Sequence, residues 1–423
     1  MHIPEAIARG LVNLTDLQVL AGHYLAQKFA AGLFDQPYTD EAWLSRLDAP
    51  AHRQLAYEAA AQSIVLLQNL NKTLPLPLAG ASALKSVALI GAFMGCEGKA
   101  GANCFGRESM LGSYTLDSGT IAVDLIPAAF QATFPGVAIS VARGASPDSG
   151  DTTDIAAAAA AAAAADVVVV ALGDSLQTCG EWLDRDSLDL PGAQLQLLEA
   201  LLDAGRPVVV VLINGRAASF GPANALLARC AAVLEAWRPG EMGAQAIVDI
   251  VSGRVNPSGK LANQWAQHVG QLGSGAQPWL QRRVAKWVAN GRSPADPSDG
   301  REYDSYVSTA YPSTPLFRFG HGLSYTTFSY SSISVAVAAH PPDLPFGGTF
   351  SGHGGAGYRA ALAAVVMSAT VKLCNAGAVD GTEVVQLYAQ GPLGMPASYA
   401  VPIVPHWKRL VGYGRLPLAA GQR

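Results

Sequence analysis

The chain has 423 residues, of which 50% are hydrophobic and only 14% are charged, and its formal net charge is −4. This composition excludes disorder over most of the chain and favours two or three globular domains with large cores. The small net charge excludes the basic surface expected of a nucleic-acid-binding or anionic-membrane-binding protein, so neither partner is predicted. Five cysteines are too few for a disulfide framework. Cys96 and Cys104 flank a glycine-rich loop, and the sequence leaves open whether they form a disulfide or stay free.

The N-terminal segment carries a helical pattern. Apolar residues at Leu17, Leu20, Tyr24, Leu25 and Phe29 predict a helix that ends at Gly32. A second helix is predicted over residues 51–70, followed by an exit turn. The first residues contain no apolar signal-peptide region, so none is expected, and the compartment is not predicted.

Short apolar runs then alternate with helical patterns. Four runs predict buried strands at residues 87–90, 167–172, 208–213 and 232–234, and residues 137–141 form a weaker fifth. Strands separated by helices indicate βαβ units and a buried parallel sheet. We therefore predict an α/β domain over residues 50–270.

The rest of the chain has a different character. Residues 271–330 are rich in Gly, Pro, Ser and aromatic residues and are predicted to be a linker, and residues 340–360 are a Pro/Gly-rich insertion. Alternating segments at 369–374 and 383–388 predict β-strands, and a turn is expected at residues 375–377 between them. Residues 331–423 are therefore expected to form a β domain.

A carboxylate-rich loop, residues 173–192, follows the predicted strand at 167–172. In open α/β sheets ligands bind at the carboxyl ends of strands. Glu181 stands next to Trp182 and close to Cys179, and apolar neighbours raise the pKa of a carboxyl group, as a general acid near neutral pH requires. The alternative is that Glu181 is an ordinary solvated charge. Asp184 and Arg185 are expected to pair and fix the loop.

The loop resembles the acid/base loop of glycoside hydrolase family 3, the β-glucosidase and β-xylosidase family. There a Glu-x-x-Asp-Arg element precedes Leu-Pro-Gly, and its Glu matches Glu181. Further resemblances to the family lie at residues 28–38, 64–76, 237–241, 256–261 and 315–328. The resemblance implies a parallel-sheet α/β sandwich over residues 50–270, then a fibronectin type III-like β-sandwich over 331–423 that is incomplete at its end. Residues 1–49 would be a remnant of the end of the family's catalytic barrel and a linker.

The resemblance also implies a chemistry. Members of the family hydrolyse O-glycosyl bonds by a retaining mechanism, with one carboxyl group as nucleophile and another as acid/base. Glu181 would be the acid/base. The nucleophilic Asp belongs to the barrel, and this sequence contains no Ser-Asp-Trp phrase that matches it. Substrates would be oligosaccharides or aryl and alkyl β-glycosides, with no cofactor and no metal. Whether glucosides or xylosides are preferred is not predicted, and relatives are often secreted or periplasmic.

Tyr114 is a candidate sugar-binding residue. It lies in residues 111–115, which resemble a family phrase whose aromatic residue stacks on a sugar. A tyrosine without a binding role is the alternative. Two other functions are also kept open: a non-catalytic carbohydrate-binding or interaction remnant, and an unrelated flavodoxin-like domain fused to a β-sandwich. The latter needs a phosphate-binding glycine loop, and the GxGxxG string at 352–357 follows no predicted strand.

Overall fold

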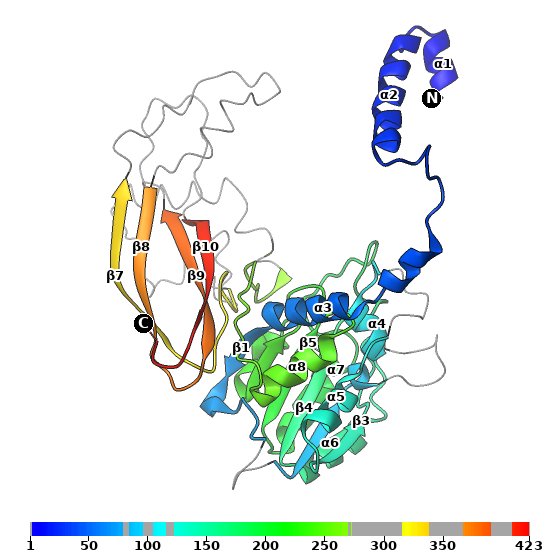
Figure 1. Cartoon of the computed structure of the whole chain (residues 1–423). Coiled ribbons are helices and arrows are strands. Elements are labelled where there is room, and N and C mark those ends of the chain that lie inside the picture. Colours follow the sequence, from blue (N-terminus) through cyan, green and yellow to red (C-terminus); the bar gives the residue numbers. More distant parts are fainter. Residues whose placement is uncertain are drawn as a thin grey trace, which may run out of the picture. The chain divides into compact units, whose positions relative to one another are not determined.

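The computed structural model describes residues 2–78, 84–95, 105–115, 122–269, 272, 315–337, 367–390 and 408–422 (Figure 1). The contacts divide the chain into two compact units, Met1–Arg53 and Gln54–Arg423. Cys96, Cys104, the 352–357 string, the whole of the predicted insertion and most of the predicted linker lie outside the described residues. None of the described helices is long and apolar enough to cross a membrane.

The N-terminal unit is helical, as the apolar spacing predicted. It contains α1 (Ile3–Ala8), α2 (Leu14–Ala30) and the short 3-10 helix η1 (Glu41–Arg46). Asn13 and Asp16 form a capping box at the start of α2, and the chain turns after the helix at Gly32, whose φ is +71°. Leu20, Tyr24 and Phe29 are each about two-thirds exposed, so the described residues leave the apolar side chains of α2 uncovered.

The second unit is built on a six-stranded sheet of order β1-β6-β5-β4-β2-β3. The strands are β1 (Val65–Asn69), β2 (Ser86–Ile90), β3 (Ala138–Ala142), β4 (Val167–Gly173), β5 (Val208–Ile213) and β6 (Ala232–Glu235). Five of them pair in parallel, as predicted. The connecting helices are α4 (Phe105–Leu111), α5 (Ile126–Thr133), α6 (Ile155–Ala164), α7 (Gln194–Asp203) and α8 (Gly243–Ser252).

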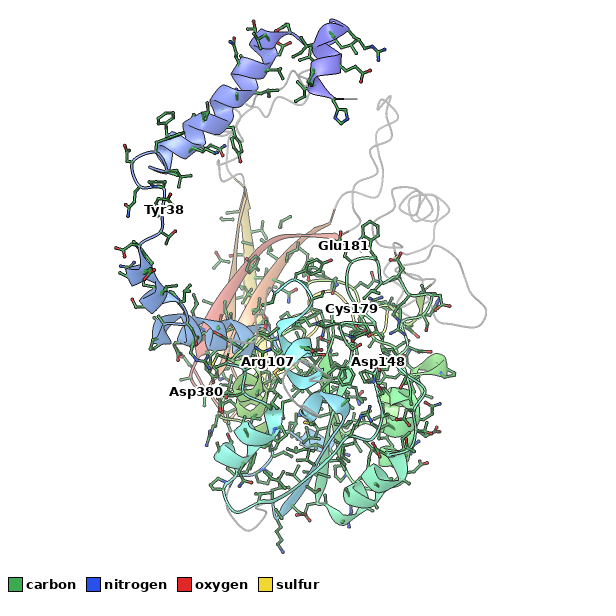
Figure 2. All side chains as sticks on the ribbon, turned by 90° about the vertical axis from the view of Figure 1, so that its right-hand side faces the viewer. Tyr38, Arg107, Asp148, Cys179, Glu181 and Asp380 are labelled. Carbon is green, nitrogen blue, oxygen red and sulfur yellow. The ribbon has the colours of Figure 1, made fainter. Side chains whose placement is uncertain are left out.

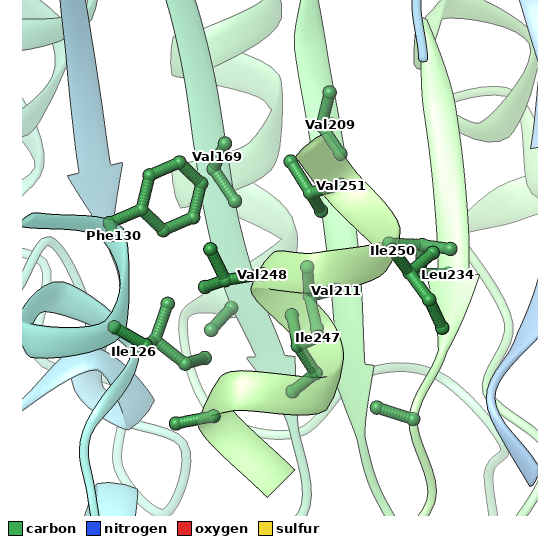
Figure 3. Packing of buried hydrophobic residues seen from close by; sticks show 14 of the residues in the cluster. Ile126, Phe130, Val169, Val209, Val211, Leu234, Ile247, Val248, Ile250 and Val251 are labelled. Carbon is green, nitrogen blue, oxygen red and sulfur yellow. The ribbon is translucent and has the colours of Figure 1, made fainter. Parts of the chain in front are cut away.

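Two buried clusters cover the two faces of this sheet. Because successive strand residues point to opposite faces, Val169 and Val209 pack with α5 and α8, whereas Val168 and Val208 pack with α6 and α7. Figure 3 shows the first cluster, in which Val248 of α8 and Phe130 of α5 meet the strand valines. This two-sided burial explains why β4 and β5 are uninterrupted apolar runs.

The predicted helix over residues 51–70 is wrong in its last part. Helix α3 (Pro50–Ser63) ends at Ser63, and the chain continues as strand β1, which pairs antiparallel with β6. The sheet is therefore mixed. Leu66 is buried against one face of the sheet while Val65 and Leu67 are buried against the other. Residues 65–67 are thus an apolar run that is buried on both sides. By hydrophobic periodicity alone, such a strand cannot be distinguished from a segment of a buried helix.

The C-terminal part contains four long antiparallel strands: β7 (Phe328–Val337), β8 (Met367–Asn375), β9 (Gly381–Gln390) and β10 (Lys408–Leu418). β7 pairs with β8, and β9 pairs with β10, in two separate two-stranded sheets. Both strands predicted here are present, and Asn375 ends β8 with its carbonyl oxygen Oδ1 accepting from the Gly377 N–H in the predicted turn. The α/β domain followed by small antiparallel sheets is the fold class expected from the sequence.

Candidate active site

The loop that carries Glu181 begins where β4 ends and returns to the sheet at α7. Gln194, the first residue of α7, closes its base. Its Nε2 donates to Gly173 O, and its Oε1 accepts from Gly173 N–H, both at 2.8 Å. The exposed Glu181 thus stands on a loop whose two ends are fastened together at the carboxyl edge of the sheet (Figure 2).

Glu181 is exposed, as expected for a group that must reach a substrate, and its neighbour Trp182 is 90% exposed. The apolar surroundings predicted for Glu181 are therefore not supplied by the described residues. Trp182 has a φ of +67°, an unusual conformation for a bulky side chain. Such strained residues persist only where the surrounding structure holds them.

The predicted pairing of Asp184 with Arg185 is corrected by the structure. Arg185 Nη1 lies 3.6 Å from Asp174 Oδ1, and Arg185 Nη2 donates to Asp189 O at 2.6 Å. Asp184 is exposed. Asp174 is 3% exposed, so the guanidinium of Arg185 reaches a buried carboxylate at the end of β4 in preference to its solvated sequence neighbour.

Asp174 is the centre of a charged cluster that the sequence did not reveal. Its Oδ2 lies 3.7 Å from Arg216 Nε and accepts from Gly215 N–H at 3.4 Å. Its backbone carbonyl accepts from Arg238 Nη1 at 2.8 Å. Burial raises the pKa of the Asp174 carboxyl group, and the nearby Arg216 opposes this most. The only signal in the sequence was that Asp174 and Arg216 each follow a buried strand.

A small hollow of about 10 Å³, with room for no more than one water molecule, lies at this cluster. The residues that line it come from the ends of β4 and β5 and from the returning part of the loop, and include Asp174, Arg185, Asp189, Asn214 and Arg216. Asp189 Oδ1 accepts from Ser219 Oγ and Gly221 N–H, which fixes the returning part of the loop to the segment after β5. The hollow is therefore too small to hold a sugar.

Beneath this edge, Glu235 at the end of β6 is completely buried. Its Oε1 accepts from Trp237 N–H at 2.8 Å, whereas its Oε2 and both polar side-chain atoms of Asn214 find no hydrogen-bond partner of good geometry among the described residues. Burial raises the pKa of Glu235 well above its ordinary value, and the Trp237 N–H opposes this only in part.

Tyr114 and Glu181 lie on neighbouring segments, although the sequence separates them widely. Tyr114 is 76% exposed in the turn after α4. Its neighbour Ser113 contacts the loop: Ser113 Oγ would stand 3.4 Å from a Cβ at Gly180, the residue before Glu181. Thus the structure brings together the two segments that the sequence singled out for acid/base chemistry and for sugar stacking.

The second unit is thus an α/β domain with an exposed carboxylate loop at the carboxyl ends of its strands, followed by antiparallel sheets. The glycosyl hydrolase family 3 C-terminal domain matches residues 64–325, and this chain belongs to glycoside hydrolase family 3.

Individual relatives agree with this assignment. The chain is 31% identical to a beta-xylosidase of Formosa agariphila over 94% of its own length and 47% of the relative. It is 28% identical to the periplasmic beta-glucosidase of Salmonella typhimurium, over 100% of this chain and 51% of that one. The chain thus spans about half the length of the curated relatives it matches.

Solved structures show the same fold. A β-glucosidase from Erythrobacter marinus superposes with a TM-score of 0.72 at 30% identity, covering 99% of this chain and 51% of that one. A β-glucosidase from Listeria innocua, solved in complex with isofagomine, superposes with a TM-score of 0.74 at 24% identity, covering 100% of this chain and 51% of that one.

Proposed function

We propose that this chain supplies the acid/base half of a retaining β-glycosidase of the β-glucosidase or β-xylosidase type, with Glu181 as the acid/base. The observation that carries the proposal is the position of Glu181: it is exposed on a loop tied at both ends to the carboxyl edge of the sheet. Family membership and the glycosidase relatives support it.

In this mechanism Glu181 protonates the departing glycosidic oxygen while a second carboxylate forms a glycosyl-enzyme. Glu181 then acts as base for the water that releases the sugar. The two carboxyl groups must stand about 5–5.5 Å apart. The sequence offers no match to the family's nucleophile phrase, so we place the nucleophile on a barrel domain of the kind that makes up the other half of such enzymes. Tyr114, on the segment beside Glu181, is proposed to stack on the sugar.

The uncovered apolar side chains of α2 fit the same proposal. Leu20, Tyr24 and Phe29 would be buried against that barrel, because large exposed apolar surfaces mark contact sites. The chain by itself is then expected to show almost no turnover of an aryl β-glucoside or an aryl β-xyloside. A turnover in the range of about 1–1000 per second, as is typical of enzymes, would contradict the proposal that the nucleophile and the acid/base lie on separate domains.

The decisive experiment joins a family 3 barrel domain to this chain before residue 35. The fusion should hydrolyse aryl β-glycosides, and Glu181→Gln should lower kcat about 100-fold or more for substrates with poor leaving groups. Activated aryl leaving groups need less protonation, so glycosyl-enzyme formation should suffer less. Azide, which needs no base, should then partly restore turnover.

The matched control is Glu199→Gln, which changes an exposed glutamate of α7 and should leave activity unaltered. Tyr114→Ala should raise KM. An active fusion indifferent to Glu181→Gln would show that the acid/base lies elsewhere, with Asp184 and Glu241 the next to be replaced. A fusion that binds sugar without hydrolysing it would favour a non-catalytic role.

A further inference from the structure

One arginine, which lies in the segment after β5, holds the part of the loop that carries Glu181. We call this part, residues 178–183, the turn. Arg216 follows β5, and its Nη2 donates to Thr178 O at 3.1 Å and to Leu183 O at 3.3 Å. These carbonyls stand on either side of Glu181, three residues before it and two residues after it. One guanidinium nitrogen therefore bridges the base of the exposed turn.

Arg216 is itself held in place by the buried carboxylate of Asp174. Its Nε lies 3.7 Å from Asp174 Oδ2, and the Asp174 side chain is only 4% exposed while that of Arg216 is 26% exposed. Asp174 is fixed in turn by Arg185 and by Arg238, which also donates from Nη1 to Ser109 O at 2.9 Å. A buried carboxylate thus orients the donor that faces the turn.

Packing holds the turn at the same place. Cys179, two residues before Glu181, has its Sγ only 2.7 Å from the position a Cβ would take at Gly215. The loop therefore packs directly against the backbone next to Arg216. This close packing is possible because Gly215 has no side chain. The Cys179 thiol is free and half-buried in this contact.

We propose that Arg216 is a positioning residue for Glu181, fixing the acid/base turn through the carbonyls of Thr178 and Leu183. This inference rests on the proposed function of Glu181 and extends it to a residue that never touches the substrate. Catalytic groups must be held close to their productive geometry by neighbouring residues. Glu181 is exposed, so the described residues do not hold its side chain by packing around it. Arg216 supplies that support.

The test measures how readily the turn opens in the full chain. Wild type, Arg216→Met, Arg216→Lys and the control Arg206→Met are treated with iodoacetamide, and alkylation of Cys179 is followed by peptide mass spectrometry. Arg206 also donates to a backbone carbonyl, that of Ala163, but away from the loop. Arg216→Met should speed alkylation of Cys179 about tenfold, which corresponds to about 1.4 kcal/mol of opening free energy. Arg216→Lys should have a smaller effect, and Arg206→Met none.

Cys230, which is fully buried in the core, is the internal reference for global unfolding. Faster alkylation of Cys179 with Cys230 unchanged supports local positioning. An unchanged Cys179 rate overturns the proposal, and so does a parallel rise at both thiols, because Arg216 would then serve overall stability only. If Arg216→Met fails to fold, Arg216→Lys decides between these outcomes.

In the barrel fusion, Arg216→Lys should lower kcat more for poor than for good leaving groups, as Glu181→Gln does, with KM changed less than about twofold. A rise in KM with kcat unchanged overturns the proposal. An inactive wild-type fusion contradicts the proposed function instead, and the alkylation result still decides whether Arg216 holds the turn.

Discussion

Gln194 and Gly173 exchange two hydrogen bonds of 2.8 Å, so the side-chain amide of the first residue of α7 acts as a backbone partner for the last residue of β4. The same Nε2 also donates to Pro191 O. Gln194 is 1% exposed, so these contacts lie in the protein interior. The loop that carries Glu181 is therefore closed by a side chain at the point where the sheet ladder would otherwise leave polar groups unpaired.

We expect Gln194→Met to lower the free energy of unfolding by about 2–4 kcal/mol, because it leaves buried backbone groups of Gly173 without partners. Denaturant unfolding followed by circular dichroism measures the loss. Gln177→Met, which replaces an exposed glutamine of the same loop, should stay within about 0.5 kcal/mol of wild type. Equal effects of the two changes would show that the Gln194 hydrogen bonds contribute little.

Gly91 directly follows β2 and has a φ of +116°, and a Cβ there would stand 2.1 Å from Ala171 O on β4. Gly91→Ala should therefore cost at least about 3 kcal/mol, since both the backbone conformation and the strand spacing must change. Gly150→Ala is the control, because a Cβ at Gly150 meets nothing within 4 Å and its φ is not positive. Thermal unfolding compares the two, and a stable Gly91→Ala protein would refute the close approach of the strands.

Glu235 should make the protein less stable as the pH rises. Its folded-state pKa is raised well above 4.5, chiefly by burial, so the folded state keeps a proton that the unfolded chain gives up. Unfolding then releases a proton, and stability declines from about pH 4.5 upward, by at most about 1.4 kcal/mol per pH unit, until the folded-state pKa is passed.

Glu235→Gln cannot titrate at this position, so its stability relative to wild type should grow as the pH rises from 4.5, until the folded-state pKa of Glu235 is passed. Urea unfolding at four pH values measures this difference, and contributions from titratable groups that do not interact with Glu235 cancel because both proteins contain them. The exposed Glu199→Gln should show no such trend. A constant difference for Glu235→Gln would mean that Glu235 is not a buried proton site.

Asn375 is the structural centre of the C-terminal strands. It is fully buried, its Nδ2 donates to Val379 O and Leu418 O, and its Oδ1 accepts from Thr326 Oγ1 and Gly377 N–H. Asn375→Ala should speed hydrogen exchange in residues 367–390 and lower stability by about 3 kcal/mol, because several buried polar groups lose their partner. Thr370→Ala, at an exposed position of β8, is the control. Unchanged exchange in Asn375→Ala would contradict this role.

The sequence alone determined much of the fold. Uninterrupted apolar runs such as those of β4 and β5 mark strands buried on both faces, and helical patterns between them require parallel crossovers. Local signals also sufficed for the turn at residues 375–377, because a turn depends on residues close in the chain. Glu181 was found by its position after a strand and by its resemblance to a family motif.

Tertiary structure decided what depends on contacts distant in sequence. Residues 65–69 became a strand because the free edge of β6 was available to pair with them. Arg185 pairs with the buried Asp174 and not with Asp184, because the end of β4 places Asp174 Oδ1 3.6 Å from Arg185 Nη1. Arg216 and Ser113 contact the Glu181 loop from segments about 35 and 70 residues away, and no local sequence pattern predicts such contacts. The sequence proposes Glu181 as the acid/base by its chemistry, but the support of its loop depends on which strand ends the folded sheet places side by side.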